Sequence, residues 1–286
     1  MNANFWLTQI FNGLSYGALL FLLGGGLSLI FGVMRIVNLS HGSYFMLGGY
    51  VALTVIKYTG SWLLAIPLAA LAIAIVGLLM ERLFLRQLGT ETLRQVLLTV
   101  GFAFLFQQAA LDIWGGDNQD IKPPAWMSGT LVVGGVYMPI YRIFMIVIAT
   151  VIGVTLWLAM EKTRLGASVR ATVDDAQMAR GVGIDTSRIS MLIFGLGAFL
   201  AALGGVIGGA FLGIYPGLDF QILPLAFAVV IIGGMGSLGG AAVGALVVGL
   251  ADNLGKALFP EISYFTLYAP MAQILAWKPT GLFGRE

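Results

Sequence analysis

The chain has 286 residues, of which 59% are hydrophobic and 10% are charged, with a formal net charge of +2. Soluble domains carry about a quarter of their residues as charged side chains, so a water-soluble enzyme is excluded, and the high apolar content excludes a disordered chain. Zero cysteines and one histidine exclude thiolate and multi-histidine metal sites. Lipid must therefore be the solvent for most of this protein.

Charge-free intervals divide the chain, because a helix that crosses the hydrocarbon needs about 20 residues. The first six residues, Met1 to Trp6, lack the basic region of a secretory signal, so the first apolar stretch is expected to be retained. The intervals are 1–34, 36–56, 58–80, 95–111, 123–141, 143–160, 189–218, 220–251 and 262–277.

Two of these intervals differ from a simple crossing. Interval 123–141 begins with two prolines and is expected to be a loop. Interval 220–251 is too long for one crossing and contains Pro224 and a glycine-rich run, so we expect two shorter helices joined by a break. The predicted fold class is an all-α, polytopic transmembrane bundle of about eight or nine segments, with one broken or re-entrant glycine-rich segment. Residues 1–286 are expected to form one domain.

Glycine accounts for 40 of the 286 residues, about twice its average share, and many glycines recur at a spacing of four within apolar segments. Lipid provides no hydrophobic drive for helix pairing, so small residues that let backbones approach closely carry the packing. We expect helix contacts at three such sets: Gly13 and Gly17; Gly205, Gly209 and Gly213; and Gly236, Gly240 and Gly244.

Residues 35–43 interrupt two apolar segments with a cation, polar side chains and a glycine. Irregular backbone at membrane depth survives only where protein or a water-filled cavity satisfies its N–H and C=O groups. The polar side chains either border a solute path or cap helix ends and hydrogen-bond within the bundle. The path candidates here are Asn38, Ser40, His41 and Ser43.

The Lys and Arg content of the loops predicts their orientation. Segments 81–94 and 161–188 are rich in these residues, whereas 112–122 holds one lysine against three aspartates. We therefore expect the first two segments to face the cytoplasm and residues 112–141 to face outside.

The sequence predicts the side of the membrane for one end of the chain only. Lys278 and Arg285 place the C-terminal tail in the cytoplasm by the same count. The side on which residue 1 lies stays open, because 36–56 could cross fully or re-enter.

Segment 161–188, the longest charged loop, predicts a short cytoplasmic helix. Thr172 and Asp175 have the spacing of a capping box, and Asp174 favours the positive end of the helix dipole. The apolar residues of this helix have no core of their own, so docking into a partner's groove explains them best. Resting on lipid headgroups is the alternative. These apolar residues are Ala176, Met178, Ala179 and Val182.

Asp219 is the only acidic or basic residue between Arg188 and Asp252, and Pro216 and Pro224 flank it. An isolated acid lies at the outer interface or lines a polar cavity. The prolines favour the interface, and Asp219 is retained as a path candidate. The break that follows could aim half-helix ends at the midplane, as in many transporters. Its candidate packing and gating glycines are Gly233, Gly234, Gly236 and Gly240.

No catalytic constellation is visible in the sequence. A phosphate-binding loop needs G-x-x-x-x-G-K-[ST], and the nearest approach, Gly249 with Gly255-Lys256-Ala257, has the wrong spacing and lacks the hydroxyl. The chain is expected to be neither an enzyme nor a cofactor-binding protein. If ATP energises it, another polypeptide must hydrolyse the ATP.

Taken together and in this order, these stretches resemble the membrane permease subunit of bacterial ABC importers for branched-chain amino acids. The resemblance covers nearly the whole chain, and its motifs are specific only in combination. The matching pieces are Asn12-Gly13 with Tyr16-Gly17, Val37 to Gly42, Glu81-Arg82, Arg164-Leu165-Gly166 with Arg170-Ala171, Asp174-Asp175, Met178-Ala179, Gly183-Ile184-Asp185, the run 233–240 and Pro279 to Arg285.

The resemblance implies the partners and the location. The chain would pair with a second homologous permease, dock two cytoplasmic ATPases that hold ATP and Mg²⁺, and receive solute from a periplasmic binding protein. It would be a multi-pass protein of the bacterial inner membrane with no nucleic-acid partner. The implied ATPase-coupling residues are Arg164, Gly166, Arg170, Asp174, Asp175, Ala176, Met178, Ala179, Arg180 and Gly183.

The resemblance also implies that the chain forms half of a translocation path for leucine, isoleucine and valine. Urea, short amides and aromatic acids stay open as solutes, because close relatives of this family import them through similar permeases. An ion-coupled secondary transporter is the alternative from another class. It would place carboxylates near the midplane, whereas Asp112, Asp219 and Asp252 lie toward the ends of apolar runs.

Overall fold

The computed structural model describes residues 3–89 and 91–284, so Arg285 lies outside the described residues. The elements are α1 (Ala3–Met34), α2 (His41–Thr59), α3 (Trp62–Leu83), η1 (Leu85–Leu88), α4 (Thr92–Trp114), η2 (Ala125–Met127), β1 (Thr130–Val133), β2 (Val136–Pro139), α5 (Ile140–Lys162), α6 (Arg164–Asp174), α7 (Ala176–Gly181), α8 (Thr186–Leu212), α9 (Leu218–Gly233), α10 (Leu238–Leu258), η3 (Pro260–Ile262) and α11 (Ser263–Trp277).

Six helices in the described ranges are long and apolar enough to cross a membrane, which confirms an all-α polytopic membrane protein. They are α1, α3, α4, α5, α8 and α10. The expected count of eight or nine segments stays a prediction. It depends on how far α2, the short apolar helix α9 and the C-terminal α11 enter the bilayer.

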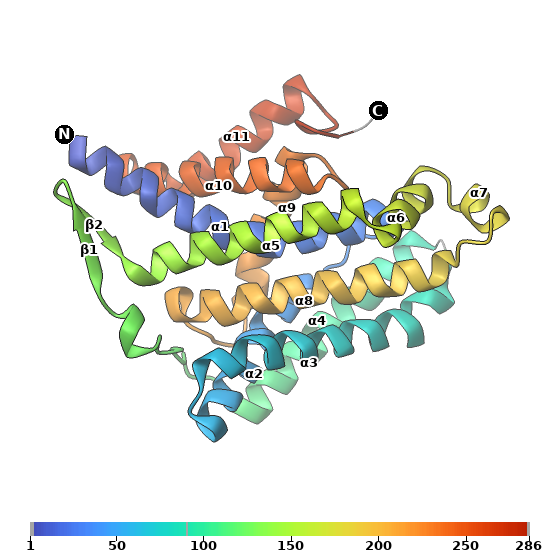
Figure 1. Ribbon diagram of the computed structural model, residues 1–286, viewed down its shortest axis with the longest axis horizontal. Helices are drawn as coiled ribbons and strands as arrows, with labels where there is room; N and C mark the ends of the chain where they lie inside the picture. The colour runs from blue at the N-terminus through green and yellow to red at the C-terminus, as the bar shows by residue number, and fades with distance from the viewer. Residues whose placement is uncertain (1–2, 90, 285–286) are drawn as a thin grey trace.

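The longer helices lie alongside one another, and α1 packs against α8, α10, α5 and α9 near the centre of the bundle (Figure 1). At one end the N-terminus lies beside the β1–β2 hairpin, and Asn4 packs against Gly135. At the other end lie α6 and α7. The start of α1 therefore lies at the same end of the bundle as the β1–β2 hairpin.

The hairpin was not foreseen within interval 123–141, which we expected to be a loop. β1 and β2 pair antiparallel around Gly134 and Gly135, and both glycines have positive φ angles of 59° and 83°. The apolar side chains of β1 are exposed. This loop is therefore an ordered extension that stands beyond the helical bundle.

Several glycines at spacing four pack helices together, as expected. Gly13 and Gly17 let α1 approach Leu250 and Ala245 of α10, and Gly205 lets α8 approach the backbone of Phe45 in α2. A Cβ atom at any of these positions would overlap a neighbouring atom or be tightly crowded by it. Close backbone contact thus replaces the hydrophobic drive that lipid does not supply.

Two glycines of these sets have another role. Gly213 ends α8 with a φ of 75°, and Gly236 lies in the turn before α10 with a φ of 81°. This left-handed region is strained for residues with a side chain. At both positions the chain turns, and Gly236 also packs against Gly32 of α1 as the spacing of four indicated.

Interval 220–251 consists of two helices joined by a break, as expected, but the break does not lie near the midplane. Gly236 packs against Gly32, and α1 ends two residues after Gly32. Gly233 and Gly240 contact each other across the turn. The break therefore closes an α9–α10 hairpin at the end of the bundle where α1 ends, and it aims no helix terminus at the membrane centre.

The C-terminal residues hold the last turn of α9. The backbone N–H groups of Leu282 and Phe283 donate to the C=O groups of Ile232 and Gly233, each at 2.9 Å. Gly234 packs against Gly284. The last carbonyls of a helix have no partner within the helix, so this C-terminal strap, residues 279–284, satisfies two of them.

Replacement of Gly205 by Ala should destabilise the bundle, because the added methyl would overlap the Phe45 carbonyl. We expect a loss of about 1–3 kcal/mol, typical of overpacking a dense interior, measured as a lower melting temperature in detergent. Gly101→Ala is the matched control, since Gly101 is exposed in α4 and nothing lies near its added Cβ. It should keep or raise the melting temperature; an equal loss in both variants would contradict the packing role.

Candidate functional site

Helix α2 begins inside the bundle. His41 Nε2 lies 3.0 Å from the carbonyl oxygen of Leu23, which is about three turns before α1 ends at Met34. Between the two helices the chain folds back into the bundle, and Arg35 starts this return with a φ of 53°. Residues 35–40 thus place irregular backbone at membrane depth, where it must be buried in protein or line water.

Helix α9 begins beside the start of α2. Ser43 Oγ donates a hydrogen bond of 2.8 Å to Asp219 Oδ2, and Gly42 has no side chain where the Asp219 backbone passes. Ser43 lies in the first turn of α2 and Asp219 in the first turn of α9. The positive ends of two helix dipoles therefore converge on one carboxylate, which stabilises a negative charge there.

The placement of Asp219 at the outer interface was wrong. Only 2% of this residue is exposed, and its carboxylate is bonded to Ser43 within the bundle. Pro224 lies inside α9, nearly two turns after its start, so it does not form the turn that the sequence suggested. The segment 213–217 carries Asp219 inward, because Ile214 contacts Gly49 whereas the Asp219 backbone meets Gly42, two turns earlier in α2.

The other path candidates form a buried network in the returning segment. Asn38 Oδ1 accepts hydrogen bonds from Ser40 N at 3.1 Å and from Ser40 Oγ at 2.7 Å. Thr99 Oγ1 of α4 accepts one from Leu39 N at 3.2 Å. The five path candidates, Asn38, Ser40, His41, Ser43 and Asp219, are all buried in this chain. Their contacts tie α1, α2, α4 and α9 together.

Two cations beside α1, Arg142 and Lys256, were not among the site residues predicted from the sequence. Arg142 donates to Asn12 Oδ1 and its guanidinium carbon lies 4.9 Å from the centre of the Phe211 ring. Lys256 Nζ lies 2.7 Å from Asp252 Oδ2 and 5.7 Å from the Tyr16 ring centre. The spacing of four between Asp252 and Lys256 was the available signal.

The predicted coupling helix exists in another form. Thr172 does not cap it, because this residue is buried in α6 and its Oγ1 donates to Ser168 O at 2.8 Å. Asp175 caps α7 and accepts hydrogen bonds from the N–H groups of Gln177 and Met178 at 2.8 and 2.9 Å. The capping box was wrong because α6 continues through residue 172, so the acid starts the second helix.

The coupling candidates divide into two groups. Gly166 and Arg170 hold α6 against α5, because both meet the Met160 carbonyl, and Arg170 also lies 4.0 Å from Glu161. Ala179 is buried beneath α7. The exposed candidates are Arg164, Asp174, Asp175, Ala176, Met178, Arg180 and Gly183. Met178 is 70% exposed and the neighbouring Val182 78%, so α7 presents an apolar knob to its surroundings.

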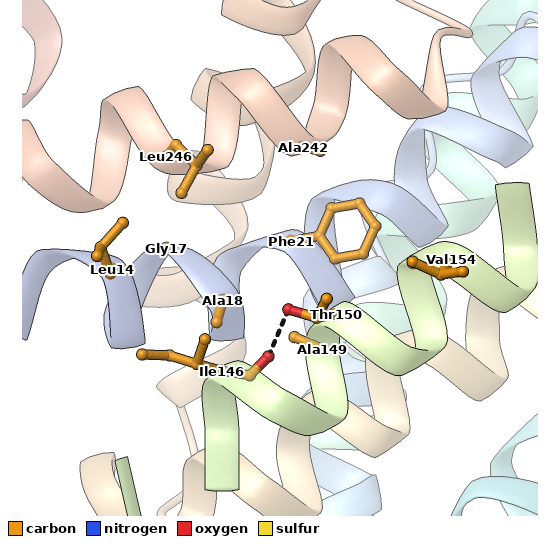
Figure 2. A pocket seen from close by; sticks show the side chains of 11 residues that line it. Leu14, Gly17, Ala18, Phe21, Ile146, Ala149, Thr150, Val154, Ala242 and Leu246 are labelled. Carbon is orange, nitrogen blue, oxygen red and sulfur yellow. Dashed lines mark hydrogen bonds between the residues drawn. The ribbon is translucent and has the colours of Figure 1, made fainter. Parts of the chain in front are cut away.

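A cavity of about 310 Å³ lies between α1, α5 and α10 (Figure 2). Its lining is apolar except for Thr150, whose hydroxyl donates to Ile146 O at 2.8 Å. A second cavity of about 590 Å³ lies where α2 and α4 end and includes Lys57, Asp120 and Lys122. Neither cavity is lined by a predicted path residue.

Comparison with known proteins shows which family the chain is similar to. Residues 9–275 match the model described as branched-chain amino acid transport system, permease component. The chain is 30% identical to the high-affinity branched-chain amino acid transport system permease protein BraD of Pseudomonas aeruginosa and to LivH of Escherichia coli, covering 98% of this chain and 96% of each relative. It is 26% identical to LivM of Escherichia coli, covering 91% of this chain and 67% of that relative.

Replacement of Ser43 by Ala should destabilise the protein by about 1–3 kcal/mol, because it removes the hydroxyl that donates to the buried Asp219 carboxylate. The loss should be much smaller in an Asp219→Asn background, where the charge is already gone. Ser128→Ala, at an exposed hydroxyl, is the control and should change little. Melting temperatures in detergent are measured for the unmodified protein, the two single variants, the double variant and the control. Equal losses from Ser43→Ala in both backgrounds would contradict the coupling between Ser43 and Asp219.

Proposed function

Because the chain belongs to the family of branched-chain amino acid transport system permease components, we propose that it is one of the two membrane subunits of an ABC importer for branched-chain amino acids. The similarity to high-affinity permease proteins over 98% of the chain carries this proposal. The whole chain then acts as one permease domain, and residues 161–188 form its coupling loop.

The distribution of basic residues orients the subunit in the bacterial inner membrane. The end of the bundle with α6 and α7 also holds the connection between α3 and α4 (Figure 1). Segment 81–94 contains Arg82, Arg86 and Arg94, which favours the cytoplasm. The start of α1 and the hairpin then face the periplasm. The hairpin and the cavity beside Lys57 and Lys122 lie on the side from which a periplasmic binding protein delivers solute.

The apolar knob on α7 is suited to dock an ATPase. Met178 and Val182 are exposed at the cytoplasmic end, and Arg180 fixes the turn after them through its hydrogen bond of 2.7 Å to Thr186 of α8. Force applied to α7 therefore passes to α8, and the contacts of Gly166 and Arg170 pass it to α5. ATP and Mg²⁺ would bind to the two ATPases, and this chain would hold no cofactor.

A second, related permease completes the membrane part. The similarity to both LivH-type and LivM-type proteins supports a pair of different but homologous chains. Each chain would supply half of the path. In this pair the glycines around 233–240 would act at the cytoplasmic end as the subunits move.

Labelling of single cysteines should show the proposed orientation, since the chain has no native cysteine. Tyr137→Cys in the exposed hairpin should react with a membrane-impermeant maleimide added to spheroplasts. Val182→Cys should react only after the membrane is permeabilised. The reverse pattern would overturn the orientation.

The function is tested by measuring the uptake of radiolabelled leucine into proteoliposomes. The proteoliposomes hold both permeases, the ATPases and trapped ATP, and the binding protein is added outside. The Met178→Asp, Val182→Asp double variant should lose uptake and co-purify with less ATPase, because two desolvated carboxylates oppose docking. Gln177→Asp, on another side of α7, is the matched control and should retain both. Uptake by the double variant at the normal rate would remove the knob from the coupling mechanism.

A further inference from the structure

We propose that the solute-conducting wall of this subunit is the lateral face formed by the start of α9 and the adjoining part of α4, and not the buried network around Ser43. This inference rests on the proposed importer function and names the surface that would meet the solute. The face is defined by Phe104, Gln107 and Gln108 of α4 and by Tyr215, Phe220 and Gln221 at the start of α9.

The first observation is irregular backbone at depth. Between α8 and α9, residues 213–217 run along α2 from Gly49 to Gly42, about 10 Å into the bundle. Tyr215, Pro216 and Gly217 are only partly buried there. Backbone of this kind does not face lipid and is stable only against protein or water.

The second observation is the polarity of the side chains on this face. Gln221 is exposed two residues after the buried Asp219, and its Oε1 accepts a hydrogen bond of 2.7 Å from the Tyr215 hydroxyl. On α4, the Gln107 amide lies beside Gly217, and Gln108 donates to Asp112 at 2.9 Å. Polar side chains within membrane segments face a water-filled cavity or another protein, because lipid cannot satisfy them.

The contrast with α3 strengthens this assignment. From residue 63 to residue 79 every exposed side chain of α3 is apolar. These side chains are Leu63, Leu64, Pro67, Leu68, Leu71, Ile75 and Leu79. Such a surface is what hydrocarbon requires, so α3 faces lipid, whereas the α4–α9 face carries the exposed amides of Gln108 and Gln221 among its apolar residues.

The chemistry of the face fits a small amino acid with an apolar side chain. The Phe104 and Phe220 rings, with centres 5.3 Å apart, offer an apolar contact for a branched side chain. The amides of Gln107 and Gln221 can donate to a carboxylate and accept from an ammonium group. Uncharged partners bind such a zwitterion weakly, which a path needs so that the solute can leave.

The buried network then has a positioning role. The Ser43–Asp219 bond holds the start of α9, and α9 presents Gln221 and Phe220 outward from the residues that follow. The second permease would close the path from the opposite side. The solute would thus pass between the two chains, along a wall whose geometry is set from within this one.

The test uses Gln107→Cys and Gln221→Cys in the assembled importer in proteoliposomes, with Leu71→Cys and Ile75→Cys on α3 as controls. A charged methanethiosulfonate reagent should modify the first pair at least about tenfold faster, because a thiol in hydrocarbon does not ionise. Equal rates in the two pairs would overturn the proposal. So would a Gln221→Cys variant that cross-links to the partner permease but resists the charged reagent, since the face would then be a dry interface.

A second measurement tests the Gln221 side chain by its effect on leucine uptake, without thiol labelling. Gln221→Leu should reduce leucine uptake by about tenfold, as expected for one lost hydrogen bond in the rate-determining state, whereas Gln221→Asn should retain most of it. Normal uptake by Gln221→Leu would overturn the proposal. If the unmodified importer shows no ATP-driven uptake of leucine, while the thiols at 107 and 221 react quickly, the substrate class fails and the water-exposed wall stands.

Discussion

The hydrogen bond between Ser43 and Asp219, at the paired starts of α2 and α9, is the contact on which the rest of this structure depends. Lipid offers no partner for a peptide group, so a chain that turns inside a membrane needs protein around the turn. Here two such turns, residues 35–40 and 213–217, end at the same place. The two helix dipoles oriented toward the carboxylate offset the cost of its burial, and α9 can begin within the bundle and still be held firmly.

Much of the architecture could be predicted from the sequence, because charge spacing reports membrane crossings directly. The helices around intervals 1–34, 58–80, 95–111, 143–160 and 189–218 are long and apolar enough to cross, and the split of interval 220–251 is present. How deep each irregular segment lies within the bundle was harder to predict. Prolines near Asp219 suggested a turn at the surface, and the glycine run suggested a break at the midplane, yet the acid is inside and the break is at the end. Composition does not encode which of two irregular segments goes inward; the contact partners decide it.

The candidate site shows the same limit in finer detail. Polar residues in 35–43 were correctly identified as unusual, and they are buried and bonded to one another and to residues of α1, α4 and α9. Gln107 and Gln221 attracted no attention because a glutamine between apolar neighbours carries no charge and breaks no pattern. The exposure of Gln221 and the position of Gln107 beside Gly217 became visible only in the folded chain. Asp219 thus holds the start of α9 in place, whereas Gln107 and Gln221 belong to the face that we propose for the solute.

The strap at the end of the chain has a consequence for biogenesis. The carbonyls of Ile232 and Gly233 accept their hydrogen bonds from Leu282 and Phe283, which the ribosome adds about fifty residues later in the sequence. During synthesis α9 can therefore enter the membrane while its last turn is still unsatisfied. Residues 279–284 are needed to complete the last turn of α9, so a chain that stops before them would present an open helix end to cellular proteolysis.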